Sequence, residues 1–227
     1  PRYGGEVRWF KGPKGIFSFH YVNAFERDGL VHLDVCLADT QPFPFIRAAS
    51  GINIDPRSIQ FSTERWSFDM SKPGDTYAAR PLCPPGDLPR LRDADQGRPY
   101  SHFWLPSMDP NAAGPPVIGG PVGAQFNALL RVEPETGRIT GAGFGPATSV
   151  NEPVHVPSGK PGHDGWLILV VDREIDPQSH TSELLVLDAT NIGAPPVARV
   201  PLPVGLHPQI HGCWVSAEQL AASKLKG

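Results

Sequence analysis

The sequence has 227 residues, 40% of them hydrophobic, and a formal net charge of −3 at pH 7. The apolar share suffices for a packed core, and the basic residues do not cluster, which argues against nucleic-acid binding or a polybasic membrane patch. The 27 prolines and 24 glycines exclude long helices and are typical of short strands joined by turns. The longest apolar run, residues 166–171, is far too short to span a membrane.

Turn signals and alternating apolar residues predict short strands along the whole chain. The expected strands are 5–10, 17–26, 30–37, 59–68, 100–105, 128–132, 138–140, 152–156, 166–172, 183–188, 197–201 and 210–216. Several of these form hairpins, namely 17–37, 128–140 and 165–188, and only the tail 217–226 has helical character. The loop 38–58 is apolar enough for a lid or cavity wall, and 106–123 reads as a long surface loop. This pattern indicates an all-β fold but leaves sandwich, barrel and propeller open.

The three cysteines, Cys36, Cys83 and Cys213, form no CxxC pair and are odd in number. They argue against a disulfide scaffold and indicate a reducing, cytoplasmic location. The chain starts at Pro1 without a start methionine or signal-peptide pattern and enters a strand pattern within a few residues. We therefore expect the C-terminal part of a longer polypeptide.

His20 stands among large apolar residues in the expected strand 17–26. Burying an imidazole there is costly unless both ring nitrogens find partners, and a metal is one such partner. A single histidine on an apolar strand is more often a satisfied core residue. A second histidine, His211, lies in another strand-like stretch near the end of the chain and makes a shared metal worth considering.

Other catalytic chemistries find no support in the sequence. There is no GxSxG nucleophile motif, no phosphate loop, and no HxH or HExxH pair of local metal ligands. His163 and His180 fall in polar turns, whereas His102 and His155 fall in apolar strands where core packing explains them. A propeller would let histidines far apart in sequence converge on its axis.

The order of several motifs resembles the carotenoid cleavage oxygenase family, closest to its lignostilbene dioxygenase branch. The resemblance runs over nearly the whole chain and rests on these stretches: RWFKGP (8–13), FHYVNAFE (19–26), DLPR (87–90) with GRPY (97–100), NEPVHVP (151–157), DGW (164–166), SELLVLD (182–188) and HGCW (211–214). It implies the C-terminal part of one seven-bladed β-propeller domain, residues 1–227, with Fe(II) on the axis.

The resemblance also implies the site residues. His20 matches the third of four histidine ligands and His211 the fourth, while the first two belong to an N-terminal half that this chain does not contain. Glu152 matches a carboxylate behind the ligands, expected to serve His211. Asp87 occupies another such position, expected to serve His20. Glutamate is the family's residue there, so Asp87, one methylene shorter, is expected to need a water or a backbone shift.

The implied activity is a non-heme Fe(II) dioxygenase that cleaves the alkene of a stilbenoid or phenylpropanoid with O₂ to give two carbonyl products. Cleavage of a carotenoid or apocarotenoid is the alternative within the same chemistry, and a truncated, non-catalytic propeller scaffold is the alternative outside it. The expected partners are a hydrophobic conjugated substrate, O₂ and the missing N-terminal half. With two of four ligands absent, the chain alone is expected to be inactive.

Overall fold

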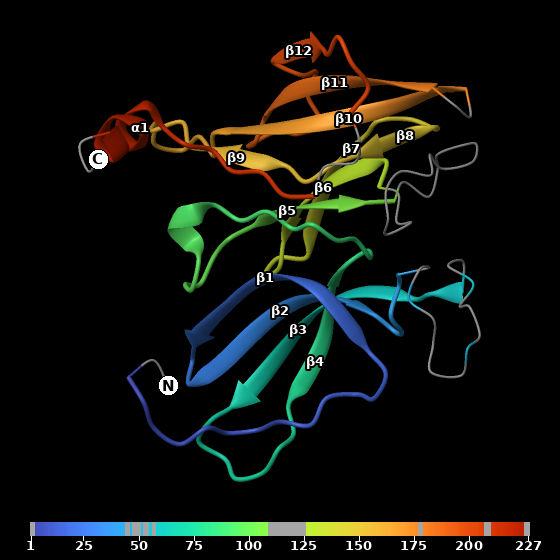
Figure 1. Cartoon of the computed structure of the whole chain (residues 1–227). Coiled ribbons are helices and arrows are strands. Elements are labelled where there is room, and N and C mark those ends of the chain that lie inside the picture. Colours follow the sequence, from blue (N-terminus) through green and yellow to red (C-terminus); the bar gives the residue numbers. More distant parts are fainter. Residues whose placement is uncertain are drawn as a thin grey trace.

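Three antiparallel β-sheets, lying one above another, form the body of the molecule in the computed structural model (Figure 1). The structure describes residues 3–43, 46, 51, 55, 58–108, 126–176, 179–206 and 210–224. No helix in these residues is long and apolar enough to cross a membrane.

The first sheet follows chain order, β1-β2-β3-β4. Its strands are β1 (Phe17–Arg27), β2 (Leu30–Ala38), β3 (Phe61–Asp69) and β4 (Ala78–Cys83). β1 and β2 are joined by Asp28 and Gly29, which both have positive φ, 54° and 75°. An Asp-Gly pair in this conformation matches the right-handed twist of the strands that it joins, which explains the tight hairpin.

The second sheet consists of β5 (Phe103–Ser107), β6 (Ala128–Glu133) and β7 (Arg138–Gly143). A short extended segment lies along the free edge of β5. Two isolated bridges fix it there, Gly86 to Ser107 and Arg90 to Trp104. Residues 86–90 therefore act as a fourth, irregular strand of this sheet.

The third sheet is built on the long hairpin of β10 and β11, with β12 on one side and β8 and β9 on the other. Its strands are β8 (Thr148–Val150), β9 (Val154–Val156), β10 (Trp166–Asp176), β11 (Ser179–Asp188) and β12 (Ala198–Pro201). Leu167, Leu169 and Val171 are at most 2% exposed, whereas Ile168 and Val170 between them are half-buried. One face of this sheet is therefore in the core and the other is partly open.

The middle sheet supplies side chains to two cores because alternate residues of a strand point to opposite faces. Trp104 packs with the apolar face of β10 and β11. Phe103 and Leu105, its neighbours on β5, pack instead with Val22 and other residues of the first sheet. All three β5 side chains are fully buried, so the three sheets pack as one unit.

A buried ionic cluster also joins the first sheet to the second. Arg65 on β3 binds both oxygens of Asp34 on β2, at 2.6 and 2.7 Å, and Asp34 also accepts the hydroxyl of Tyr100. Arg65 also donates to Glu135 in the β6–β7 turn, at 2.5 Å. Although burial opposes the charge of Arg65, these carboxylates raise the pKa of its guanidinium.

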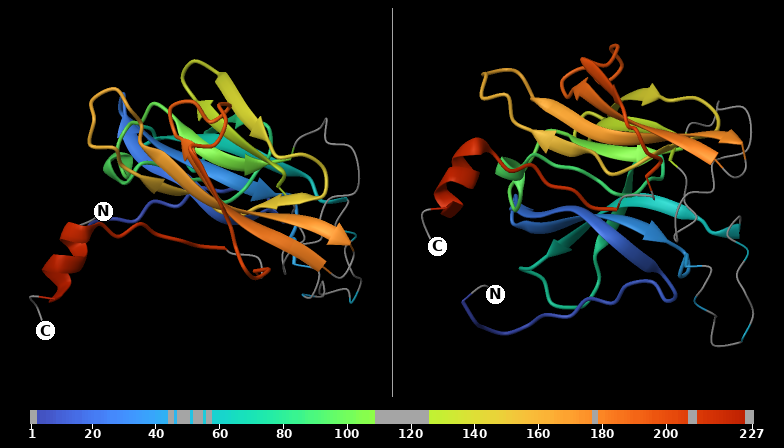
Figure 2. Two further views of the ribbon diagram at one scale, coloured as in Figure 1. Left: turned by 90° about the horizontal axis from the view of Figure 1, so that it is seen from above. Right: turned by 45° about the horizontal axis from the view of Figure 1, so that its top comes forward.

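The C-terminal segment leaves the sheets and ends in α1 (Ala217–Lys224), which stands apart from them in the views of Figure 2. Ser216 and Gln219 start this helix with reciprocal bonds, because Gln219 N donates to Ser216 Oγ and Ser216 N donates to Gln219 Oε1. This is a capping box, which satisfies two amides that the helix leaves free.

Most expected strands are present, but two expectations are wrong. Residues 5–10 form no strand; they lie as an extended arm whose Arg8 donates to carbonyl oxygens of Met70, Lys72 and Gly74. Residues 210–216 also form no strand. Two strands were not expected, β4 and β8, because prolines and glycines surround them. Most of the expected loop 106–123 and part of 38–58 fall outside the described residues.

Candidate metal centre

His20 lies at an irregularity of β1. Ser18 pairs with Leu37 but Tyr21 pairs with Val35, so β1 has one residue more than β2 between these two pairs. Such a β-bulge breaks the alternation of side chains and re-aims one of them. The imidazole is about one-quarter exposed, with 23% of its side-chain surface accessible.

Asp87 meets this imidazole directly. Its Oδ1 lies 2.8 Å from Nδ1 of His20 and also accepts the amide hydrogen of Leu88. Asp87 therefore reaches the imidazole directly, and no bridging water is needed. Gly86 lies so close to β5 that a Cβ there would be 2.2 Å from the carbonyl oxygen of Pro106. Leu88 has a positive φ of 57°, which completes the sharp bend around Asp87.

His211 is paired with Glu152. The Nδ1 atom of His211 lies 3.2 Å from Oε2 of Glu152, and the same oxygen accepts the amide hydrogen of Gly212 at 3.0 Å. Glu152 is 10% exposed, whereas the His211 side chain is 64% exposed. A Cβ at Gly212 would come within 2.8 Å of Val154, so glycine permits the close approach of this segment to β9. Trp214, three residues after His211, is 46% exposed.

The structure brings the two imidazoles together from distant parts of the sequence. Their ring centroids lie 5.1 Å apart and the ring planes meet at 79°. Burial opposes protonation of His20, but the hydrogen bond and charge of Asp87, with the charge of Glu152, outweigh it and raise the pKa of this imidazole.

This arrangement fits the requirements of a metal ligand pair. Because an ionised carboxylate only accepts hydrogen bonds, Nδ1 of each imidazole must be the donor, and the lone pair of Nε2 is left for a metal. Within the described chain, neither Nε2 has a hydrogen-bond partner. The same residues contain no group of three or more His, Cys, Asp or Glu side chains able to hold a metal. The pair could therefore supply only part of a coordination sphere.

The surroundings of the pair are apolar. Phe17, Phe19 and Phe43 form an aromatic cluster with centroid distances of 4.6 to 5.8 Å, and Phe19 stacks on His20. A hollow of ≈ 200 Å³ beside His211 is lined mostly by apolar residues such as Ile168 and Leu184, together with Glu152. Phe43 belongs to the loop that was expected to form an apolar wall.

Arg90 is a residue of the candidate site that the sequence did not indicate. Its Nη2 lies 3.0 Å from Oε1 of Glu152 and 3.0 Å from the carbonyl oxygen of Gly212. Arg90 belongs to the same short motif as Asp87, so its position was known but its partners were not. Nothing in the spacing of residues 90, 152 and 212 indicates that they meet.

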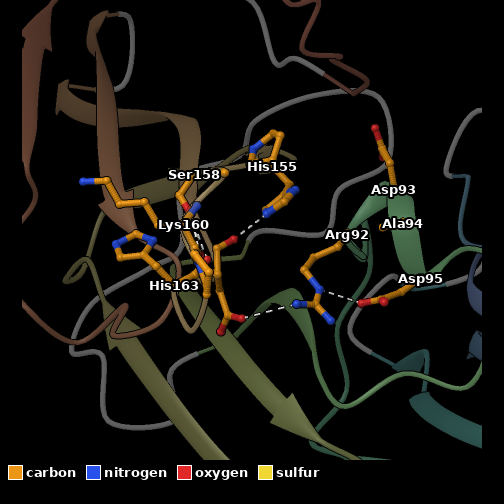
Figure 3. A pocket seen from close by; sticks show the side chains of 12 residues that line it. Arg92, Asp93, Ala94, Asp95, His155, Ser158, Lys160 and His163 are labelled. Carbon is orange, nitrogen blue, oxygen red and sulfur yellow. Dashed lines mark hydrogen bonds and ion pairs between the residues drawn. The ribbon is translucent and has the colours of Figure 1, made fainter.

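The other histidines of the apolar strands have their own partners. His155 lies 2.6 Å from the carbonyl oxygen of Asp164 and stacks on Trp104, while His102 contacts Ser101 and the carboxylate of Asp164. His155 and Asp164 line a separate cavity of ≈ 590 Å³, whose other charged residues include Arg92, Asp95 and Lys160 (Figure 3). Opposite charges pair within this cavity, as Arg92 does with Asp95.

Nearly the whole chain matches one protein-family model. The family model described as retinal pigment epithelial membrane protein matches residues 1–216. This chain belongs to that family, the carotenoid cleavage oxygenases. The resemblance seen in the motifs is thereby confirmed.

Individual proteins similar to this carotenoid cleavage oxygenase chain support the same family assignment. It is 34% identical over 219 residues to lignostilbene-α,β-dioxygenase isozyme III of Sphingomonas paucimobilis, covering 95% of the chain and 44% of the relative. It is 29% identical to apocarotenoid-15,15'-oxygenase of Synechocystis, covering 94% and 41%. The crystal structure of Pseudomonas brassicacearum lignostilbene dioxygenase superposes with a TM-score of 0.82 at 30% identity, covering 92% and 43%. The chain thus spans less than half the length of these relatives.

Proposed function

We propose that this chain is the C-terminal part of a non-heme Fe(II) dioxygenase that cleaves the C=C bond of a stilbenoid or related phenylpropanoid. The observation that carries the proposal is the pair of imidazoles, His20 and His211, each held at Nδ1 by a carboxylate. The substrate class is supported by a relative of this chain, a lignostilbene dioxygenase to which the chain is 34% identical.

In this proposal His20 and His211 are two of four histidine ligands, and the other two come from the N-terminal half. The complete protein, meaning this chain with the remaining length of its relatives, would then form one seven-bladed propeller domain with the metal on its axis. The three cysteines of the chain are free thiols, which suits a cytoplasmic enzyme.

The residues of this chain would hold and shield the reaction rather than carry covalent chemistry. Asp87 and Glu152 fix the two imidazoles as Nδ1–H tautomers and offset part of the charge of a divalent cation. Phe17, Phe19 and Phe43 offer flat apolar surfaces beside His20 for a conjugated substrate. Iron held by His20, His211 and the two further histidines would supply the activation of O₂. One O₂ and one alkene give two carbonyl products, so no external reductant is needed.

The test uses the complete protein with 4,4'-dihydroxystilbene, an apocarotenal and ¹⁸O₂, with the aldehyde products read by mass spectrometry. We expect labelled aldehydes from the stilbene, and loss of both product and bound iron in His20→Ala and His211→Ala. His180→Ala is the matched control, because His180 bonds only the Leu206 carbonyl oxygen in the described structure. Iron and activity retained in both ligand variants would overturn the proposal.

Apocarotenoid cleavage is the second candidate, favoured by the 29% identity to an apocarotenoid oxygenase. Labelled products from the apocarotenal but not from the stilbene would select it. No cleavage of either substrate by iron-loaded protein would favour a non-catalytic scaffold.

A further inference from the structure

Arg90 joins the chain segments that meet at His211. Its Nε donates to the carbonyl oxygen of Pro153 at 2.9 Å, and its Nη2 donates to the carbonyl oxygen of Gly212 at 3.0 Å. The same Nη2 lies 3.0 Å from Oε1 of Glu152. All three acceptors belong to Glu152 or to a residue next to Glu152 or His211. One guanidinium therefore binds the carboxylate of Glu152 and the backbone of both segments, at Pro153 and at Gly212.

The base of this side chain is itself fixed. The amide of Arg90 donates to the carbonyl oxygen of Trp104 at 2.7 Å, and the amide of Trp104 donates back to Arg90 at 2.9 Å. Trp104 is fully buried between the second and third sheets. The guanidinium therefore extends from the core of the molecule to the candidate metal centre, with 18% of its side chain exposed.

Glu152 depends on this contact for its orientation. Its two oxygens point to different partners, Oε1 to Arg90 and Oε2 to the Nδ1 of His211 and the amide of Gly212. Without the guanidinium the carboxylate could turn about its terminal torsion, which has broad minima. His211 is 64% exposed, so few packing contacts would then hold the ring.

We propose that Arg90 is a positioning residue that locks Glu152, and through it fixes the orientation and the Nδ1–H tautomer of His211. This inference rests on the proposed metal role of His211. Its effect is selective, because the described partners of Asp87 are His20 and the Leu88 amide, and no arginine is among them. Arg90 thus serves one of the two imidazoles and not the other.

The first experiment reads the ring nitrogens of His20 and His211 by ¹⁵N NMR in the metal-free complete protein. At a pH high enough for both imidazoles to be neutral, wild type should show both rings as Nδ1–H tautomers. Arg90→Gln should convert His211 to a mixture of tautomers and leave His20 unchanged. Arg92→Gln is the matched control, since Arg92 pairs with Asp95 and lies on the same loop. An unchanged His211 in Arg90→Gln, or equal changes in both rings, would overturn the inference.

The second experiment measures Co²⁺ affinity by its absorption spectrum. Arg90→Gln should weaken binding by roughly 10–100-fold, as loss of an outer partner does at other sites. Arg90→Lys should recover part of it, because the ammonium can still pair with Glu152 but lacks the planar fork that reaches Glu152, Pro153 and Gly212 together. The lysine variant also serves as the test if glutamine prevents folding, and its His211 must then show mixed tautomers.

The two experiments separate the inference from the proposed function. A shifted His211 tautomer with unchanged Co²⁺ affinity would keep Arg90 as the positioning residue and refute His211 as a ligand. An unshifted tautomer, with Co²⁺ binding lost in His211→Ala, would refute Arg90 and keep the ligand.

Discussion

Nδ1 of His20 lies 2.8 Å from Oδ1 of Asp87, so the shorter carboxylate reaches the imidazole without an intermediary. The segment that carries Asp87 lies against β5 at Gly86 and bends at Leu88, and this backbone course brings the carboxylate to the imidazole. The position of Asp87 beside His20 thus depends on the backbone on either side of it.

Replacing Gly86 by alanine should therefore damage the site. The new Cβ would clash at 2.2 Å with the Pro106 carbonyl oxygen and push the segment, with Asp87, away from His20. We expect iron retention to fall by roughly 10-fold and stability by about 1–3 kcal/mol. Iron content after gel filtration measures the first effect and urea unfolding the second.

Gly12→Ala is the matched control, since its Cβ would find nothing closer than 3.8 Å. If Gly86→Ala retained iron as well as Gly12→Ala does, the backbone would not be what places Asp87.

The sequence indicates candidate site residues but not all of the contacts between them. Alternating patterns located most strands. The motifs named His20, Asp87, Glu152 and His211, which the structure joins in two hydrogen-bonded pairs, and their metal role stays a prediction. What periodicity cannot reveal is a contact between distant segments. The role of Arg90, for example, depends on three acceptors contributed by other parts of the chain.

The failed strand predictions have a physical reason as well. Residues 5–10 and 210–216 have the alternating pattern of strands. This pattern indicates which side chains could be buried, but it does not indicate whether a neighbouring strand is present to form hydrogen bonds. In the described structure both segments are extended and mostly exposed. β4 was missed because Pro81 interrupts it, and proline is tolerated there since β4 is an edge strand.

Glu152→Gln should separate orientation from packing. Glutamine has nearly the same shape but no charge, so it pairs weakly with Arg90 and no longer requires His211 to donate from Nδ1. We expect iron retention or turnover of the complete protein to drop by roughly 10–100-fold without unfolding. Iron analysis and circular dichroism measure the two quantities, and normal iron content with normal turnover would refute the role of Glu152.

The ionic cluster of Asp34 and Arg65 should dominate over surface pairs in its effect on stability. Arg65→Ala leaves Asp34, which is fully buried, without its charged partner, and such a loss costs about 3–5 kcal/mol. The control is Arg199→Ala, because Arg199 is half exposed where it meets Glu183, and exposed pairs contribute about 1 kcal/mol or less. Equal unfolding midpoints in urea for the two variants would contradict this ranking.

His102 should make stability depend on pH. Burial, followed by the charge of Arg131, lowers the pKa of this imidazole from its ordinary value of 6.5 to about 4. Because the unfolded chain takes up the proton first, stability is full above about pH 6.5 and falls by ~3 kcal/mol as pH drops to about 4. Urea unfolding across this pH range measures the loss of stability. In His102→Phe this loss should be smaller by the same ~3 kcal/mol. Parallel profiles for the two proteins would show that His102 does not titrate this way.

The last prediction concerns residues 1–227 by themselves. Two imidazoles leave most of the coordination sphere of a ferrous ion to water, so this chain alone should bind iron weakly. The open face of the third sheet also presents Ile168 and Val170, which favours aggregation or requires a covering partner. We expect no alkene cleavage by the isolated chain, and recovery of iron binding and cleavage when the N-terminal half of the protein is added. Calorimetry with Fe²⁺ under argon and an aldehyde assay provide the measurements. Robust cleavage of a stilbene or apocarotenoid by the 227-residue chain would show that the four-histidine assignment is wrong.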